Sequence, residues 1–142
     1  HYDLQTPWWH LGEAADLARD FPETTIILNH TGLPSDRSEA GLNGWRAALE
    51  GFADQPNTAI KISGIGMAGQ PWTTDSNGPL VLDAIRIFGI DRCMFASNFP
   101  VDGLCASYDT IFSGFKRIVA GLPAADQRKL FHDNAINYYR PV

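Results

Sequence analysis

Two polar side chains close apolar runs of the sequence and are followed at once by residues that break a strand. His30 closes one run and precedes Gly32 and Pro34, and Asn98 closes another and precedes Pro100. An imidazole can bind a metal, shuttle a proton or polarise a carbonyl group near neutral pH. A histidine at a strand end is as often only a hydrogen-bonded structural residue. The strand-breaking residues that follow His30 favour a functional role for it.

An acidic residue lies near the second of these positions. Asp102 is the nearest carboxylate beyond Asn98. It could act as a general base on water, although an acid in such a loop is more commonly exposed. The amide of Asn98 could form an Asx turn or orient a substrate, but it cannot take a proton from water at neutral pH. We therefore take His30, Asn98 and Asp102 as the candidate catalytic residues.

Residues that follow other apolar runs supply the candidates for substrate binding. Gln5 and Ser63 each stand at the end of a run. Trp8, Trp9 and Trp72 fall in loops, where an aromatic side chain either covers a pocket or packs against the core. We take Gln5, Ser63 and Trp8 as the candidate substrate-binding residues.

The elements that must position these residues are four β-like runs separated by helical patterns. The apolar residues of the runs are nearly consecutive, which suits parallel strands covered on both faces. The helical patterns repeat apolar residues at intervals of three and four. A βα unit that occurs four times without a hairpin signal predicts a parallel α/β sheet. The predicted strands are 2–5, 25–30, 59–64 and 92–98, with helices near 11–18, 42–52, 79–88 and 107–119.

Local signals predict the helix boundaries. Pro79 suits the first turn of the third helix, because a proline there loses no intrahelical hydrogen bond. The end of the chain is expected to form two short helices, 124–131 and 133–139, with Asp133 and Asn134 at the start of the second.

Four βα units can form an open doubly wound sheet or half of an eight-stranded barrel, which usually has about 250 residues. A dinucleotide-binding open sheet would carry a glycine-rich phosphate loop after its first strand. Residues 5–9 read Gln-Thr-Pro-Trp-Trp instead. The sequence therefore favours half of a (β/α)₈ TIM barrel.

Strand alternation predicts which side chains share a face. Ile26, Leu28 and His30 share one face, so an inward-facing His30 would stand above apolar side chains in the barrel interior. Lys61 and Ser63 also share a face. Because a buried lysine needs a partner, we expect Lys61 on the side covered by helices.

Composition limits the partners of the protein. The chain has 11 Lys and Arg against 16 Asp and Glu, a net charge of -5 and no long basic run, so neither nucleic acid nor an anionic membrane is expected. No apolar stretch approaches the about 20 residues that cross a bilayer, and residues 1–5 do not resemble a signal peptide. Cys93 and Cys105 form neither a zinc motif nor a disulfide framework, and Cys93 is expected in the core. We expect a cytoplasmic protein with a small-molecule substrate.

Five segments, in order, resemble strands five to eight and the closing helix of the amidohydrolase-related family. They are Tyr2–Gln5, Ile27–Pro34, Lys61–Gly64, Met94–Asp102 and Leu130–Ala135. The resemblance covers nearly the whole chain. It implies that residues 1–142 are the C-terminal half of a single TIM-barrel hydrolase domain, with the N-terminal half absent.

The resemblance implies an enzyme that hydrolyses a lactone, of the sugar or pyrone-dicarboxylate type. Non-oxidative decarboxylation on the same scaffold is an alternative. His30 corresponds to the strand-six histidine of the family, which would polarise or hydrogen-bond the substrate. Asn98 stands where many members carry an aspartate that activates water, so either Asp102 substitutes for it or Asn98 only orients. This departure also allows a third hypothesis, a catalytically silent binding barrel.

Metal dependence and assembly are left open by the resemblance. The cofactor would be one divalent metal such as zinc, or none. A strand-one His-x-His pair that binds the metal would lie outside this chain, and a catalytic zinc usually has three protein ligands, of which His30 is the one candidate here. A homo-oligomer is a further expectation, because half a barrel exposes two strand edges and an apolar interior.

Overall fold

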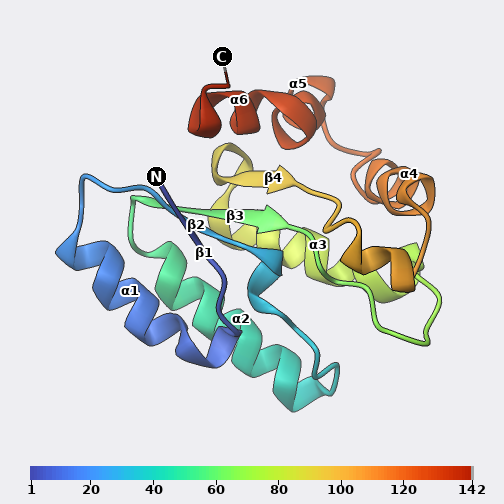
Figure 1. Ribbon diagram of the computed structural model, residues 1–142, viewed down its shortest axis with the longest axis horizontal. Coiled ribbons are helices and arrows are strands. Elements are labelled where there is room, and N and C mark those ends of the chain that lie inside the picture. The colour runs from blue at the N-terminus through green and yellow to red at the C-terminus, as the bar shows by residue number, and fades with distance from the viewer. Residues whose placement is uncertain (142) are drawn as a thin grey trace.

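The computed structural model describes residues 1–141, which form a four-stranded parallel sheet flanked by helices (Figure 1). The strands lie side by side in chain order: β1 (Tyr2–Leu4), β2 (Ile26–Leu28), β3 (Thr58–Ile62) and β4 (Cys93–Phe95). All four predicted strands are present, although the ordered ladders are shorter than the apolar runs. The α/β fold class predicted from the sequence is confirmed.

Three helices connect the strands and cover one face of the sheet. They are α1 (Leu11–Asp20), α2 (Glu39–Ala53) and α3 (Thr74–Phe88). Helix α3 begins earlier than predicted, because Thr73 caps it by accepting a hydrogen bond from the N–H of Ser76 at 3.1 Å. Pro79 therefore lies inside the helix and not in its first turn.

The two faces of the sheet bury different side chains, because successive strand residues point to opposite sides. One face joins the large apolar core beneath the helices, and it carries Ile26, Leu28, Ile60, Ile62, Cys93 and Phe95. The opposite face carries Ile27, Ala59 and Met94, which pack with Tyr138 and Tyr139. Cys93 is fully buried, as the sequence predicted.

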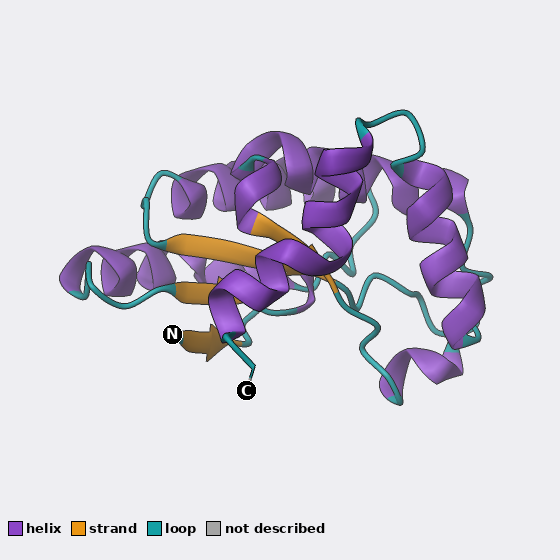
Figure 2. Cartoon of the chain, turned by 90° about the horizontal axis from the view of Figure 1, so that it is seen from above, coloured by secondary structure: helices purple, strands orange, loops and turns teal. Residues whose placement is uncertain are grey.

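After α4 (Tyr108–Ile118), which joins the first core through Ile111 and Phe115, the chain crosses to the second face of the sheet. Helix α4 packs against α3, and α5 (Ala124–Arg128) and α6 (Asn134–Tyr139) follow. Figures 1 and 2 both show α6 on the opposite side of the sheet from α1 and α2.

Helix α6 begins at Asn134, close to the predicted start, but it is not separated from α5 and no side chain caps it. The turn Lys129–Asp133 is a π-helix that joins α5 to α6 without a break. The Asn134 side chain is buried, and its Nδ2 donates to the carbonyls of Ile90 at 2.6 Å and Cys93 at 2.8 Å. Asn134 therefore anchors the terminal helix to the start of β4, and its side chain does not cap a helix.

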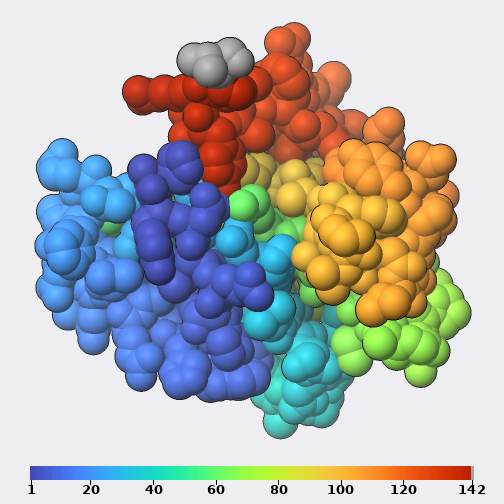
Figure 3. All heavy atoms as spheres, in the orientation of Figure 1, coloured from blue at the N-terminus to red at the C-terminus, as the bar shows by residue number. Residues whose placement is uncertain are grey.

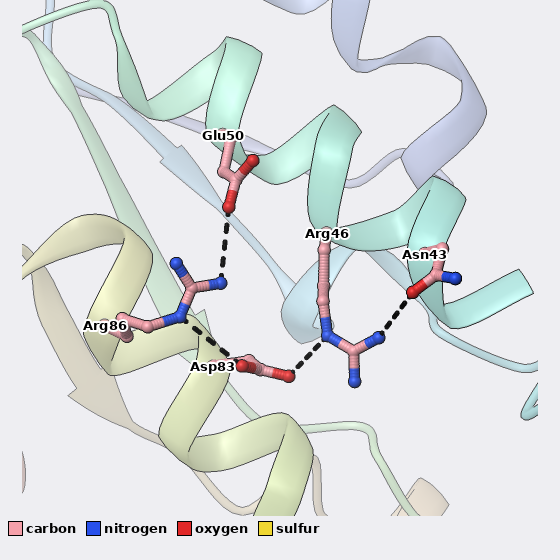
Figure 4. Close-up of polar contacts among 5 residues, drawn as sticks. All are labelled: Asn43, Arg46, Glu50, Asp83 and Arg86. Carbon is pink, nitrogen blue, oxygen red and sulfur yellow. Dashed lines mark hydrogen bonds and ion pairs between the residues drawn. The ribbon is translucent and has the colours of Figure 1, made fainter. Parts of the chain in front are cut away.

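Ion pairs connect α2 and α3 on the outer surface (Figure 4). Asp83 lies 2.6 Å from Nε of Arg46 and 3.5 Å from Nε of Arg86. Arg86 also reaches Glu50 at 3.3 Å, and Arg46 donates to Asn43 at 3.1 Å. These groups are partly exposed, so we expect a contribution of at most about 1 kcal/mol from each pair.

Within residues 1–141, no helix combines the length and the apolar character needed to span a membrane.

Candidate active site

Residues from three successive strand ends meet at the carboxyl edge of the sheet. Nδ1 of His30, after β2, lies 3.0 Å from the hydroxyl oxygen of Ser63, after β3. Nδ2 of Asn98, after β4, donates to Oδ1 of Asp102 at 2.8 Å. Asp102 and His30 influence each other's pKa through their charges, so the two pairs form one cluster. Parallel α/β proteins place their active sites at this edge.

A left-handed turn carries His30 to this edge. His30, Thr31, Gly32 and Leu33 have φ values of 54°, 56°, 68° and 55°. Non-glycine residues rarely adopt this region, and such strain concentrates at functional sites. Gly64 makes the turn possible, because a Cβ at that position would lie 2.8 Å from Cβ of His30.

Thr31 fastens the turn to the end of β3. Its buried hydroxyl donates to the carbonyl of Ser63 at 2.9 Å and accepts from the N–H of Ser63 at 3.1 Å. Nε1 of Trp45, in α2, donates to the carbonyl of Thr31 at 2.8 Å. These bonds fix the backbone on both sides of the His30–Ser63 contact.

Asp102 lies in the turn η4 (Val101–Leu104) and is only 5% exposed. An exposed loop acid is the commoner case, but here Asn98 and the N–H groups of Gly64 and Gly66 surround the carboxylate. Burial raises the pKa of Asp102, and the hydrogen bond from Asn98 and the charge of His30 oppose that rise in part. The carboxyl group therefore binds a proton more readily than an exposed aspartate does.

His30 is affected in the opposite way. Burial and the nearby charge of Lys61 lower the pKa of His30, and the charge of Asp102 partly restores it. The imidazole is therefore predominantly neutral at pH 7, since even an unperturbed histidine has a pKa of about 6.5. A neutral ring can donate one hydrogen bond and accept another.

The face predicted for the residues before His30 is wrong. Ile26 and Leu28 point toward the helices, and Ile27 points to the opposite face. Strand β2 ends at Leu28, so His30 reaches the site through the left-handed turn and not through strand alternation. Apolar residues cover both faces of the strand, which leaves no polar position in the sequence to set the phase.

The side predicted for Lys61 is wrong as well. Its neighbours Ile60 and Ile62 fill the helix-covered core, so Lys61 lies on the second face. The partner it needs comes from β1: Nζ lies 2.7 Å from Oδ1 of Asp3. The hydroxyl of Tyr139 donates to the same carboxylate at 2.6 Å, and Lys61 Nζ lies 5.2 Å from the centre of the Tyr139 ring.

A hollow opens on this second face between the N-terminal segment, the terminal helices and the segment near residue 105 (Figure 3). Atoms with the colour of β3 lie at its floor. Asp3 and Lys61 supply the charges of this face. Its apolar residues Ile27, Ala59 and Met94 are buried against α6.

The candidate binding residues are distributed unevenly. Ser63 contacts His30. Gln5 is exposed just beyond β1, and no hydrogen bond joins it to the cluster within the described part of the chain. Trp8 packs against Gly32 and lies where a Cβ on Gly44 would be 2.8 Å away, so it fills space between the turn and α2. A role of Gln5 or Trp8 in binding substrate stays a prediction.

Trp72 is a packing residue, one of the two alternatives for the loop tryptophans. It is 6% exposed, its ring centre lies 5.5 Å from that of Phe115, and it fills the space beside Gly114. Trp9, by contrast, is 59% exposed.

Sequence reasoning missed two residues that shape the site. Thr31 holds the turn and Gly64 leaves room for the imidazole. The signal for Gly64 was its place directly after the polar strand end at Ser63, where glycine permits a positive φ, here 62°. Nothing local to Thr31 pointed to its hydrogen bonds, because their partner is 32 residues away.

A parallel sheet with a buried acid and a neutral imidazole at its carboxyl edge is the arrangement of a barrel-type α/β enzyme. A family model described as amidohydrolase matches residues 1–140, and the chain belongs to that family.

The chain is similar to proteins about twice its length. Protein y4mH of Sinorhizobium fredii is 51% identical over 98% of this chain and 46% of its own length. L-fucono-1,5-lactonase of Burkholderia multivorans is 33% identical over 80% of this chain and 42% of its own. The chain thus spans about half the length of these relatives.

Two solved structures also match this chain over about half of their own length. An amidohydrolase from Burkholderia multivorans with bound HEPES superposes with a TM-score of 0.88 and 27% identity, over 99% of this chain and 53% of that one. A second crystal form of an amidohydrolase from the same organism, with bound zinc, gives a TM-score of 0.87 over 52% of that chain. The four-stranded sheet therefore corresponds to about half of a TIM-barrel amidohydrolase.

The residues described here do not by themselves form a metal centre. Residues 1–141 contain no group of three or more His, Cys, Asp and Glu side chains placed to hold a metal ion. Nδ1 of His30 is engaged with Ser63, which leaves Nε2 as the one ring nitrogen of His30 available to bind a metal ion. A catalytic zinc usually has three protein ligands, so this donor set does not fit one.

Proposed function

We propose that the protein hydrolyses the ester bond of a lactone. The observation that carries the proposal is the buried Asp102 carboxylate, held by Asn98 in the same cluster as a neutral His30. The reaction needs a base for water and a donor for the carbonyl oxygen, and these two residues have the chemistry for those tasks.

In the proposed reaction Asp102 takes a proton from water as the water oxygen attacks the lactone carbonyl carbon. His30 donates a hydrogen bond to the carbonyl oxygen as that oxygen gains negative charge. The ring C–O bond then breaks, and the proton held by Asp102 passes to the departing oxygen. The product is a hydroxy acid.

Asp102 suits the base better than Asn98, because an amide accepts no proton at neutral pH. Burial raises the pKa of Asp102, which strengthens it as a base relative to an exposed aspartate. The hydrogen bond from Asn98 to Oδ1 holds the carboxylate in one orientation.

The similarity to a protein named L-fucono-1,5-lactonase supports a lactone as substrate. Metal dependence is not part of the proposal, because no step uses a metal.

The test is Asp102→Asn in the full-length protein, assayed on a panel of sugar lactones by acid release. If Asp102 is the base, we expect turnover to fall by about 10² to 10⁴. The wild-type rate should fall on the acid side with a midpoint above the about 3.9 of a free aspartate, since the raised pKa keeps Asp102 protonated to higher pH. That limb should be missing from any residual activity of the variant.

Asp109→Asn is the matched control, because Asp109 is an exposed acid in the first turn of α4. It should keep the wild-type rate and profile. An unchanged rate for Asp102→Asn would contradict the assignment of the base. Release of carbon dioxide from an aromatic or related acid would point to the decarboxylase, and binding without turnover to the silent barrel.

A further inference from the structure

Arg37 is a half-buried cation in the loop between the His30 turn and α2. Its Nη2 donates to the carbonyl of Ile65 at 2.7 Å, and Nη1 donates to the carbonyl of Ser76 at a long 3.4 Å. The buried Nε has no acceptor among the described residues. A guanidinium has five N–H donors, so Arg37 keeps donors that a bound molecule can use.

The charge of Arg37 has no counterion in the described part of the chain. No acid within residues 1–141 lies within ion-pair distance of it, whereas Arg46 is paired with Asp83 at 2.6 Å. The neighbouring acid, Asp36, instead accepts a hydrogen bond from the N–H of Ser38 at 2.9 Å. A charge that is partly withdrawn from water without a partner is unfavourable, so an anion beside Arg37 would be stabilised there.

Arg37 lines two cavities, of about 600 Å³ and about 200 Å³. The larger one has a mostly apolar wall, and none of the described residues that line it is aromatic. Its aliphatic residues are Leu42, Met67, Pro71, Pro79 and Leu80. Neither cavity is lined by His30, Ser63, Asn98 or Asp102, so a molecule bound here lies outside the candidate active site.

The larger cavity is built by the two inner βα units of the sheet. Arg37 and Leu42 follow β2, and Ser76 and Leu80 belong to α3, which follows β3. Strands β2 and β3 are the inner strands, and the sheet edges that pair on one side only are β1 and β4. The walls of the cavity therefore come from elements that do not form the open edges of the sheet.

We propose that this cavity is a binding site, separate from the active site, for a small acid that carries an alkyl chain. The carboxylate accepts hydrogen bonds from Arg37 and supplies the counterion that the described chain lacks. The alkyl chain lies against Leu42 and Leu80, since a flexible aliphatic chain fills a cavity that offers no aromatic ring to stack on. The proposal does not depend on lactone hydrolysis.

The test is calorimetry of the full-length protein with octanoate and octanamide, which share a chain and differ in charge. Wild-type protein should bind octanoate at least about tenfold more tightly, the usual gain from a charge-assisted hydrogen bond. In the series from butyrate to octanoate, affinity should rise by up to about fourfold for each added CH₂ group, because each is buried against the aliphatic wall. Equal binding of octanoate and octanamide, or no gain with chain length, would overturn the proposal.

Arg37→Gln should weaken octanoate binding by about 10- to 100-fold and change octanamide binding less than about twofold. Arg37→Lys, which keeps the charge but not the planar donors, should be intermediate. Arg46→Gln is the matched control, because that guanidinium is already paired with Asp83, and it should bind octanoate as wild type does. If Arg37 only holds the carbonyl of Ile65, Arg37→Gln will lower the Tm and weaken both ligands equally, which would contradict the site.

A crystal structure of the full-length protein with octanoate locates the ligand. We expect its carboxylate within hydrogen-bond distance of the Arg37 guanidinium and its chain between α2 and α3. Octanoate bound at the cluster of His30 and Asp102 instead would overturn the proposal of a separate site. Because neither measurement needs turnover, a failure of lactone hydrolysis and a failure of this site are told apart.

Discussion

At the scale of single residues, Asn98 and Asp102 lie at the centre of the proposed chemistry. The amide donates to the carboxylate at 2.8 Å and has a left-handed φ of 55°. Such a strained residue persists only where its surroundings hold it. Asn98 thus orients Asp102, the residue that we propose as the base.

Replacement of Asn98 by Asp separates these two roles. If Asn98 only orients Asp102, a second carboxylate at hydrogen-bond distance is a like charge that raises the pKa of one of the two acids. The acid limb of the pH-rate profile should then move to higher pH. Asn98→Ala should move it the same way by a smaller amount, because it removes a hydrogen bond that lowers the pKa of Asp102.

The measurement is the pH-rate profile of both variants on one lactone. A higher rate for Asn98→Asp, with the acid limb of the profile unmoved, would mean that the new carboxylate at position 98 acts as the base. Asp102 would then not be the base in the variant.

At the scale of elements, the turn η2 (His30–Gly32) and the end of β3 act as one unit, held by the two hydrogen bonds of the Thr31 hydroxyl. Thr31→Val keeps the shape of the side chain and leaves the backbone N–H and carbonyl of Ser63 without these buried partners. We expect the free energy of unfolding to fall by about 3 kcal/mol, since a buried unpaired polar group costs about 1–3 kcal/mol.

Asp83→Asn provides the comparison between elements. It weakens the ion pairs of α2 and α3 in Figure 4, which lie at the surface, and should change the free energy of unfolding by at most about 1 kcal/mol. Chemical denaturation of both variants in the full-length protein is the measurement. A similar effect of the two substitutions would contradict the anchoring role of Thr31.

At the scale of the whole molecule, the described chain leaves apolar surface and sheet edges uncovered. Within residues 1–141, β1 and β4 each pair with a strand on one side only. Val101 and Leu104 are 60% and 80% exposed beside the site. An exposed strand edge and an apolar patch favour association with another chain.

We therefore expect residues 1–142, expressed alone, to self-associate. Sedimentation velocity over a dilution series should show oligomers or aggregates, and thermal melts should be broad. A monodisperse monomer that unfolds cooperatively would contradict the prediction that these residues form half of a larger barrel domain.

The sequence by itself determined the alternation of strands and helices, the buried Cys93, and the meeting of polar residues at one edge. These follow from local patterns, because apolar spacing and strand-breaking residues act within a few positions of the chain. It also brought His30, Ser63, Asn98 and Asp102 forward as candidates, since parallel strands end at a common edge.

Only the tertiary structure decided which face each strand presents and how the site is held. Lys61 points away from α1, α2 and α3 because Asp3, 58 residues earlier, offers it a partner on the other face. Asp102 is buried because Gly64 and Gly66 from another loop close over it. Such contacts join residues far apart in the chain, and a strand that is apolar on both faces carries no local signal that favours either side.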